Sequence, residues 1–190
     1  MYLFKRVWGL LVSPSKSWDT ISQDPKDEKK YLTHYFYPLI ALVAFTAFLN
    51  PFIKGNEEKE LKEILFVGLR LLIVSLTSGV LGFFLTAKVL DYGFVRWFKM
   101  KSDSRRAQML TAYASTPVLV ISILTKLISD FFFMNILFFY VVVLVWEAST
   151  HFYSVDESKQ GRFTTLASVA ILALPMIVEK IFLLILPGLK

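Results

Sequence analysis

Two residues of opposite charge, Arg70 and Glu179, interrupt long apolar stretches of the sequence. A charge at membrane depth costs about 2.5–3.5 kcal/mol on insertion scales, so it requires a partner or a function. At about 1.5 Å per residue, each lies roughly 10 Å from the end of its stretch, and the two ends lie on the same side of the membrane. We therefore expect an intramembrane ion pair between Arg70 and Glu179, and Lys126 and Asp130 could form a second, helical pair. The alternative is that the cations extend their side chains to the headgroups.

Motifs of catalysis are missing from the sequence. It contains no Gly-rich phosphate loop, no His-Glu-x-x-His and no Gly-x-Ser-x-Gly. Cysteine is also missing, which excludes disulfides, thiolate nucleophiles and sulfur ligands. His151 follows Glu147 at a spacing compatible with a metal pair, but two ligands are too few for a site. We therefore expect no enzyme activity, catalytic residue, metal or cofactor.

The composition indicates a membrane protein. Of 190 residues, 55% are hydrophobic and only 19% are charged, whereas average soluble domains carry about 25% charged residues. A soluble helical protein would have to bury five long apolar stretches in this short chain, so we disfavour it. Lipid-exposed backbone must satisfy its own hydrogen bonds, which predicts helices. We expect one all-α membrane domain over residues 1–190, with five spans at about 35–53, 64–89, 109–129, 131–148 and 163–186.

Features within the spans predict how they pack. Pro117 and Pro175 each remove a backbone donor and are expected to kink their helices. Small residues at spacing four in the second span, Ser75/Gly79 and Ser78/Gly82, favour close helix packing. The tight connector at 129–130 predicts that the third and fourth spans form a helical hairpin.

The distribution of Lys and Arg predicts the orientation. The segments 1–34, 90–108 and 149–162 contain six, five and two of these residues, thirteen together, against five on the other side. Cytoplasmic segments carry the excess of positive charge. We expect the N-terminus in the cytoplasm and, because five spans are an odd number, the C-terminus outside.

The first 34 residues are too polar to span a membrane. Residues 2–11 form an amphipathic helical pattern, and Ser13-Pro14 is typical of a helix start. A second short helix would carry Trp18 and end before Pro25. We expect two helices in the cytoplasmic membrane interface, with Trp8 and Trp18 as anchors. A signal peptide is disfavoured, because its apolar core would be shorter than the required ~7–15 residues.

The connector after the second span mixes aromatic and basic residues. In a soluble protein this mixture would suggest nucleic acid, but beside a membrane it indicates anionic headgroups. Trp97 is expected to anchor the interface. The expected lipid contacts are Arg96, Lys99, Lys101, Arg105 and Arg106.

The N-terminal segment with Pro14 and Trp18, the first span beginning YFYPLIAL and the third containing AYASTP resemble the YIP family. This resemblance implies a five-span protein of the compact bacterial type, in the cytoplasmic membrane, with its N-terminus inside. Eukaryotic members are tied to vesicle traffic and small GTPases of the Rab class. Their Asp-Leu-x-Gly-Pro motif is not found in this sequence, which argues against a small GTPase partner.

Together these features predict a non-enzymatic integral membrane protein of the YIP type. It would act in membrane organisation or trafficking-like roles, through anionic lipids or a membrane or cytoplasmic protein partner at its cytoplasmic face. Two alternatives stay open: a small transporter or channel that uses the charged residues of the outer half, and a membrane subunit of a larger complex.

Overall fold

The structure, a computed structural model, describes residues 2–23, 30–54 and 60–185. Within these ranges the chain forms helices and no strand. In chain order the elements are α1 (Tyr2–Val12), α2 (Pro14–Gln23), the π-helix η1 (Tyr31–Phe36), α4 (Tyr37–Ile53), α5 (Leu61–Phe98), α6 (Ser104–Ala114), α7 (Thr116–Leu127), the 3-10 helix η2 (Ser129–Phe139), α8 (Tyr140–His151) and α9 (Glu157–Ile185).

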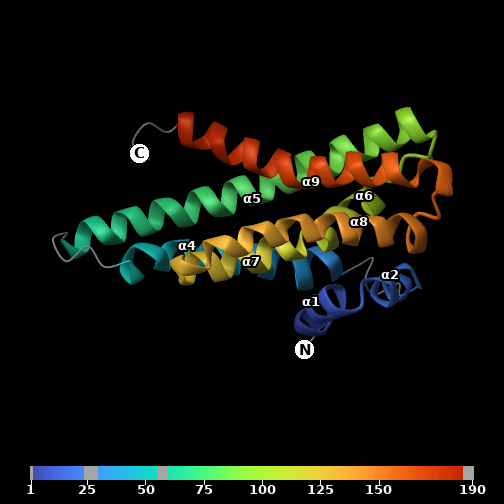
Figure 1. The fold of residues 1–190 in the computed structure, drawn as a ribbon. Coiled ribbons are helices and arrows are strands. Elements are labelled where there is room, and N and C mark those ends of the chain that lie inside the picture. Colours follow the sequence, from blue (N-terminus) through green and yellow to red (C-terminus); the bar gives the residue numbers. More distant parts are fainter. Residues whose placement is uncertain (1, 24–29, 55–59, 186–190) are drawn as a thin grey trace.

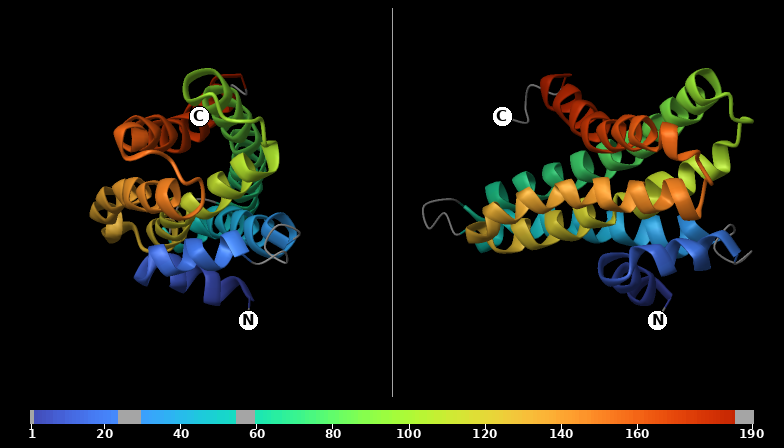
Figure 2. Two further views of the ribbon diagram at one scale, coloured as in Figure 1. Left: turned by 90° about the vertical axis from the view of Figure 1, so that its right-hand side faces the viewer. Right: turned by 45° about the vertical axis from the view of Figure 1, so that its right-hand side comes forward.

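Five helical segments are long and apolar enough to cross a membrane, which confirms the predicted all-α, five-span fold. They are Tyr31–Ile53, Leu61–Phe98, Ser104–Leu127, Phe133–His151 and Glu157–Leu184. In Figure 1, α4, α7 and α8 lie side by side, and α9 crosses α5 above them. The helices α1 and α2 pack beneath this bundle near one end (Figure 2). We name this end, with α1, α2 and the connectors 99–103 and 152–156, the basic end.

The second span is much longer than expected. Helix α5 has 38 residues, or about 57 Å at 1.5 Å per residue, against about 30 Å of hydrocarbon. The aromatic and basic stretch before Lys99, expected in a connector, therefore forms the last turns of α5. The helix ends where Lys99 adopts a left-handed conformation with φ 55°.

The third and fourth spans are not continuous α-helices. The third is interrupted at Ser115, two residues before Pro117, where a kink is expected because proline lacks a backbone donor. The fourth begins with the 3-10 helix η2 of 11 residues instead of the expected α-helix. A 3-10 helix rises about 2.0 Å per residue, against 1.5 Å in an α-helix. This added length helps the shortest apolar stretch to span the bilayer.

A close contact between Gly82 and Pro175 sets the crossing of α5 and α9. Helix α9 runs through Pro175, and a Cβ placed at residue 82 would lie 2.8 Å from the Cα of this proline. Glycine therefore allows the backbones to approach, as small residues do in membrane helix pairs. Beyond this crossing, the first turns of α5 and the last turns of α9 diverge (Figures 1 and 2).

Candidate functional site

The expected ion pair between Arg70 and Glu179 is corrected by the structure. Arg70 lies twelve residues before Gly82, and Glu179 lies four residues after Pro175. Their axial distances from the crossing are therefore about 18 and 6 Å, and the two helices also diverge there. The two side chains form no salt bridge among the described residues, and Nη2 of Arg70 is buried without a hydrogen-bond partner.

Lys126, unlike Arg70, bonds to a polar side chain of another span among the described residues. Its ammonium group donates a 3.2 Å hydrogen bond to Oγ of Ser75. The Asn50 side chain donates a 2.6 Å hydrogen bond to the Lys126 carbonyl. This arrangement ties α4, α5 and α7 together opposite the basic end. The side chain of Asp130, the other expected partner of Lys126, lies outside the described residues.

The five basic residues expected to bind lipid divide into two groups. Arg96, Lys99 and Lys101 are exposed, and their charged groups have no hydrogen-bond partner in the described chain. Arg106 is exposed as well, but its guanidinium also donates to the Phe152 carbonyl and lies 4.9 and 5.2 Å from the Phe152 and Tyr153 ring centroids. Arg106 therefore combines internal contacts with an exposed position, and its lipid contact stays a prediction. Arg105 is exposed and also has internal interactions.

The connector that carries these cations has a fixed shape. Both carboxylate oxygens of Asp91 accept hydrogen bonds, at 2.8 Å each, from the Ser102 hydroxyl and the Asp103 backbone. Asp103 in turn caps α6, accepting from the backbone N–H of Arg106 at 2.9 Å. The hydroxyl of neighbouring Tyr153 is buried, and this burial raises its pKa. The cations are thus presented on an ordered surface.

The three tryptophans expected as interfacial anchors lie in different surroundings. Trp8 and Trp97 are each 60% exposed. Trp18 is fully buried, with its ring 6.0 Å from that of Tyr113 and 5.4 Å from that of Phe152. The expected anchor position of Trp18 is therefore wrong, because this face of α2 packs against the bundle.

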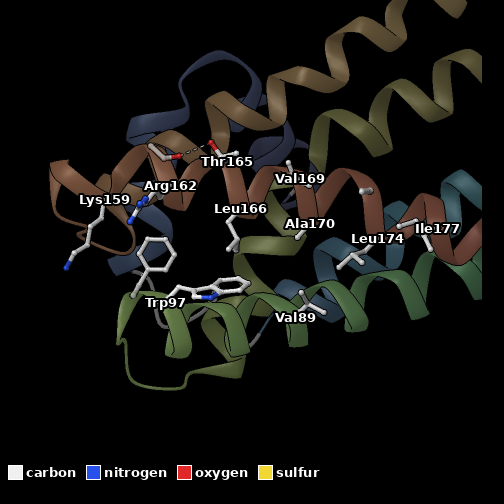
Figure 3. A pocket seen from close by; sticks show the side chains of 13 residues that line it. Val89, Trp97, Lys159, Arg162, Thr165, Leu166, Val169, Ala170, Leu174 and Ile177 are labelled. Atoms are coloured by element: carbon white, nitrogen blue, oxygen red, sulfur yellow. Dashed lines mark hydrogen bonds between the residues drawn. The ribbon is translucent and has the colours of Figure 1, made fainter.

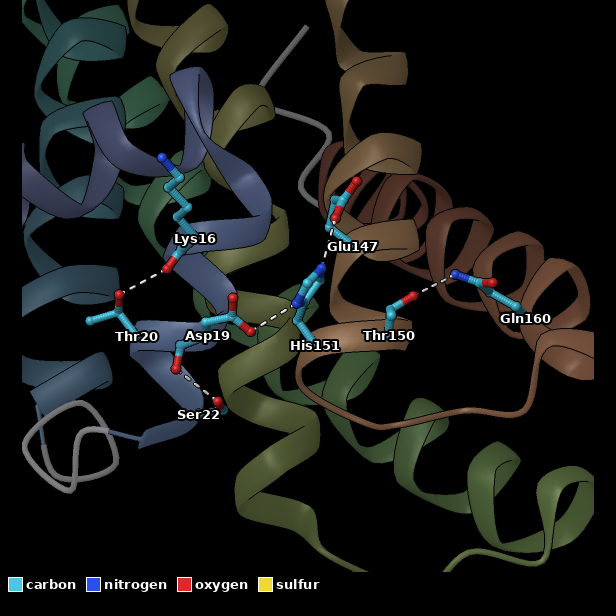
Figure 4. Close-up of polar contacts among 8 residues, drawn as sticks. All are labelled: Lys16, Asp19, Thr20, Ser22, Glu147, Thr150, His151 and Gln160. Atoms are coloured by element: carbon cyan, nitrogen blue, oxygen red, sulfur yellow. Dashed lines mark hydrogen bonds and ion pairs between the residues drawn. The ribbon is translucent and has the colours of Figure 1, made fainter.

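A histidine joins the N-terminal helices to the bundle. Nδ1 of His151 lies 2.8 Å from a carboxylate oxygen of Asp19 on α2, and Nε2 lies 3.3 Å from Glu147 one turn earlier in α8 (Figure 4). The Tyr140 hydroxyl adds a 3.0 Å hydrogen bond to the carbonyl of Leu11. The Glu147–His151 spacing is visible in the sequence, but the contact with Asp19 is not, because it joins residues 132 positions apart. No group of three potential metal ligands occurs among the described residues.

An apolar groove between α5 and α9 was not foreseen from the sequence. It has a volume of about 1010 Å³ and lies on the basic-end side of the Gly82–Pro175 crossing. In Figure 3, Trp97, Lys159 and Arg162 lie at one end of it, and Leu174 and Ile177 lie toward the other. A second cavity, of about 890 Å³, lies beside α1 and α2 and is lined by Phe4, Trp8, Lys5 and Lys16 among others. Both cavities combine apolar walls with cations.

The comparisons with known proteins agree with this architecture. A model of the Yip1 domain matches residues 8–179, which include all five spans except the last turns of α9. No curated protein and no solved structure shows significant similarity to the chain. The match covers well over half of the sequence, so this chain belongs to the Yip1 domain family.

Proposed function

We propose that this Yip1 family protein is a non-enzymatic protein of the bacterial cytoplasmic membrane that acts in membrane organisation by binding anionic lipid at its basic end. The observation that carries the proposal is that exposed aromatic rings and exposed cations share this end of the bundle. Aromatic residues favour the interface, and cations near it attract anionic headgroups. The excess of Lys and Arg supports a cytoplasmic location for this end.

Helix α1 supplies one part of this surface. Leu10 is buried, and Leu3 and Val7 pack against the core. On another face, Phe4 and Trp8 are 71% and 60% exposed, and their rings stack with centroids 6.4 Å apart. A helix with one face held by protein and aromatic residues on another suits the membrane interface.

The end of α5 and its connector supply the other part, through Trp97 and the cations Arg96, Lys99 and Lys101. The alternative of a transporter receives less support, because Lys126 is committed to Ser75 and the two cavities described above do not include Arg70 or Glu179. The main alternative is that a protein partner, not anionic lipid, binds the same cationic surface.

Replacing Arg96, Lys99 and Lys101 together with glutamine is expected to reduce retention of anionic lipid. Each charge near the surface contributes about 1 kcal/mol, so the loss of three corresponds to roughly 100-fold in relative affinity. The measurement is the ratio of phosphatidylglycerol to phosphatidylcholine retained by the purified protein, determined by mass spectrometry.

The matched control replaces Lys54, Lys62 and Lys180 with glutamine, since these exposed lysines lie away from the basic end. It should leave the ratio unchanged. An equal ratio in both variants and the unaltered protein, with the topology intact, would contradict lipid binding by this surface and indicate a protein partner.

A further inference from the structure

The groove between α5 and α9 has the dimensions of a site for one lipid chain. Small ligands typically occupy cavities of about 300–1,000 Å³, and this groove has about 1010 Å³. Its lining on α9 extends from Arg162 to Ile177, about 22 Å at 1.5 Å per residue. Half of a ~30 Å hydrocarbon core, the depth of one leaflet, is about 15 Å. The groove is therefore long enough to hold an acyl chain through a leaflet.

The lining is apolar along this length and cationic at one end only. Val89, Leu166, Ala170, Leu174 and Ile177 form its walls. The guanidinium of Arg162 lies at the end nearest Trp97 (Figure 3) and makes no hydrogen bond or ion pair within the described chain. A guanidinium binds a phosphate through two parallel hydrogen bonds. The charge and polarity of the groove lining thus match an amphiphile with one anionic head and an apolar tail.

Lys159 adds a second cation beside Arg162. Its ammonium group lies 3.5 Å from Asp156, and both side chains are more than half exposed. An exposed pair of this kind contributes little energy, so Lys159 can turn toward a headgroup at small cost. The head end of the groove therefore offers two cations to one anionic group.

The groove is held open by contacts on both sides of it. Toward the basic end, Phe163 of α9 stacks on Phe94 with centroids 4.5 Å apart and meets Phe98 edge-on at 5.6 Å. Toward the middle of the bundle, Gly82 meets Pro175. Between these contacts, the side chains of Ala170 and Ala173 are too small to fill the space between the two helices. A preformed site avoids the ordering cost that a flexible surface would incur on binding.

We propose that this groove binds one anionic phospholipid, with its phosphate at Arg162 and Lys159 and an acyl chain along α9. The inference rests on the proposed function in that the basic end must lie at the membrane surface. It adds a specific site of defined stoichiometry, separate from the surface cations Arg96, Lys99 and Lys101. Exposed apolar side chains at the groove edge, such as Val169 and Ile177, leave it open to the lipid phase.

The test uses the full-length protein, stripped of lipid in detergent and titrated with dioleoyl phosphatidylglycerol, with native mass spectrometry as the readout. We expect one tightly retained lipid per chain. Arg162→Gln should weaken its retention at least about tenfold, because a charge-assisted hydrogen bond to phosphate is lost. Ala173→Phe, which fills the groove, should abolish retention.

Two controls isolate the groove. Lys54→Gln removes an exposed cation away from both the groove and the basic end, and Met176→Phe adds an aromatic ring on an exposed position of α9 outside the groove. Both should retain one lipid as the unaltered protein does. Arg162 is exposed, so its substitution provides a readout even if Ala173→Phe fails to fold.

Retention of one lipid by both Arg162→Gln and Ala173→Phe would overturn the groove site. Equal retention of phosphatidylcholine and phosphatidylglycerol by the unaltered protein would overturn the proposed preference of the groove for anionic lipid. Loss of a dimer in Ala173→Phe would show that a second copy of the chain, not lipid, covers the groove. The proposed function is tested separately: the variant lacking Arg96, Lys99 and Lys101 should keep the single groove lipid and lose the wider anionic preference.

Discussion

Trp18→Ala should lower the free energy of unfolding by about 3–5 kcal/mol, the range for removing a large buried aromatic side chain. Trp18 is fully buried and packs against the rings of Tyr113 and Phe152. Its indole N–H has no hydrogen-bond partner among the described residues, so packing accounts for the effect. Trp18→Phe should therefore retain much of the stability. Denaturant unfolding in detergent, followed by far-UV circular dichroism, measures the change.

Trp8→Ala is the matched control, because Trp8 is 60% exposed on the neighbouring helix. In detergent this change should shift the free energy of unfolding by no more than about 0.5 kcal/mol, as is usual for exposed positions. Equal stabilities of Trp18→Ala and Trp8→Ala would contradict the burial of Trp18 and restore its expected position at the interface.

Arg106→Gln should lower the free energy of unfolding by about 2–3 kcal/mol. Its guanidinium donates to the Phe152 carbonyl, and a hydrogen bond to a charged group contributes about 1.5–3 kcal/mol. Its position over the Phe152 and Tyr153 rings adds about 0.5–1 kcal/mol, the range for an exposed site. Arg106→Lys should recover only part of the loss, because lysine lacks the planar guanidinium.

The same unfolding measurement on Lys101→Gln provides the comparison, since Lys101 is exposed and has no partner in the described chain. We expect little change in its stability. If instead Arg106→Gln unfolds like the unaltered protein and loses anionic lipid, the stabilising role of Arg106 is refuted, and the lipid contact expected from the sequence is its main role.

The five spans could be predicted because length and apolarity alone determine which segments can cross a bilayer. The ends of the spans were less predictable. Helix α5 continues to Phe98 because Asp91, Arg96 and the aromatic residues between them are compatible with a helix outside the hydrocarbon. The start of α2 at Pro14 was predictable, because Ser13-Pro14 is a local capping pattern.

Tertiary contacts explain what the sequence could not predict. The depths of Arg70 and Glu179 were inferred from the ends of their spans, but the Gly82–Pro175 contact sets their relative height. An amphipathic pattern identifies the apolar face of α2, not whether lipid or protein covers it, so the burial of Trp18 was missed. The α5–α9 groove forms where two helices that are far apart in the sequence separate in space. The composition of the helices does not show where this separation begins.

The proposed function requires that the basic end faces the cytoplasm and meets the membrane there. The native chain contains no cysteine, so single cysteines can report which side each end occupies. Glu60 and Ser158 are both exposed. Glu60 directly precedes α5 and Ser158 lies in the first turn of α9, and these two helices begin at opposite ends of the bundle (Figure 1). In intact cells, an impermeant thiol reagent should label Glu60→Cys and leave Ser158→Cys unlabelled until the membrane is opened. Labelling of Ser158→Cys from outside, with Glu60→Cys protected, would place the basic end outside the cytoplasm and overturn the proposed orientation.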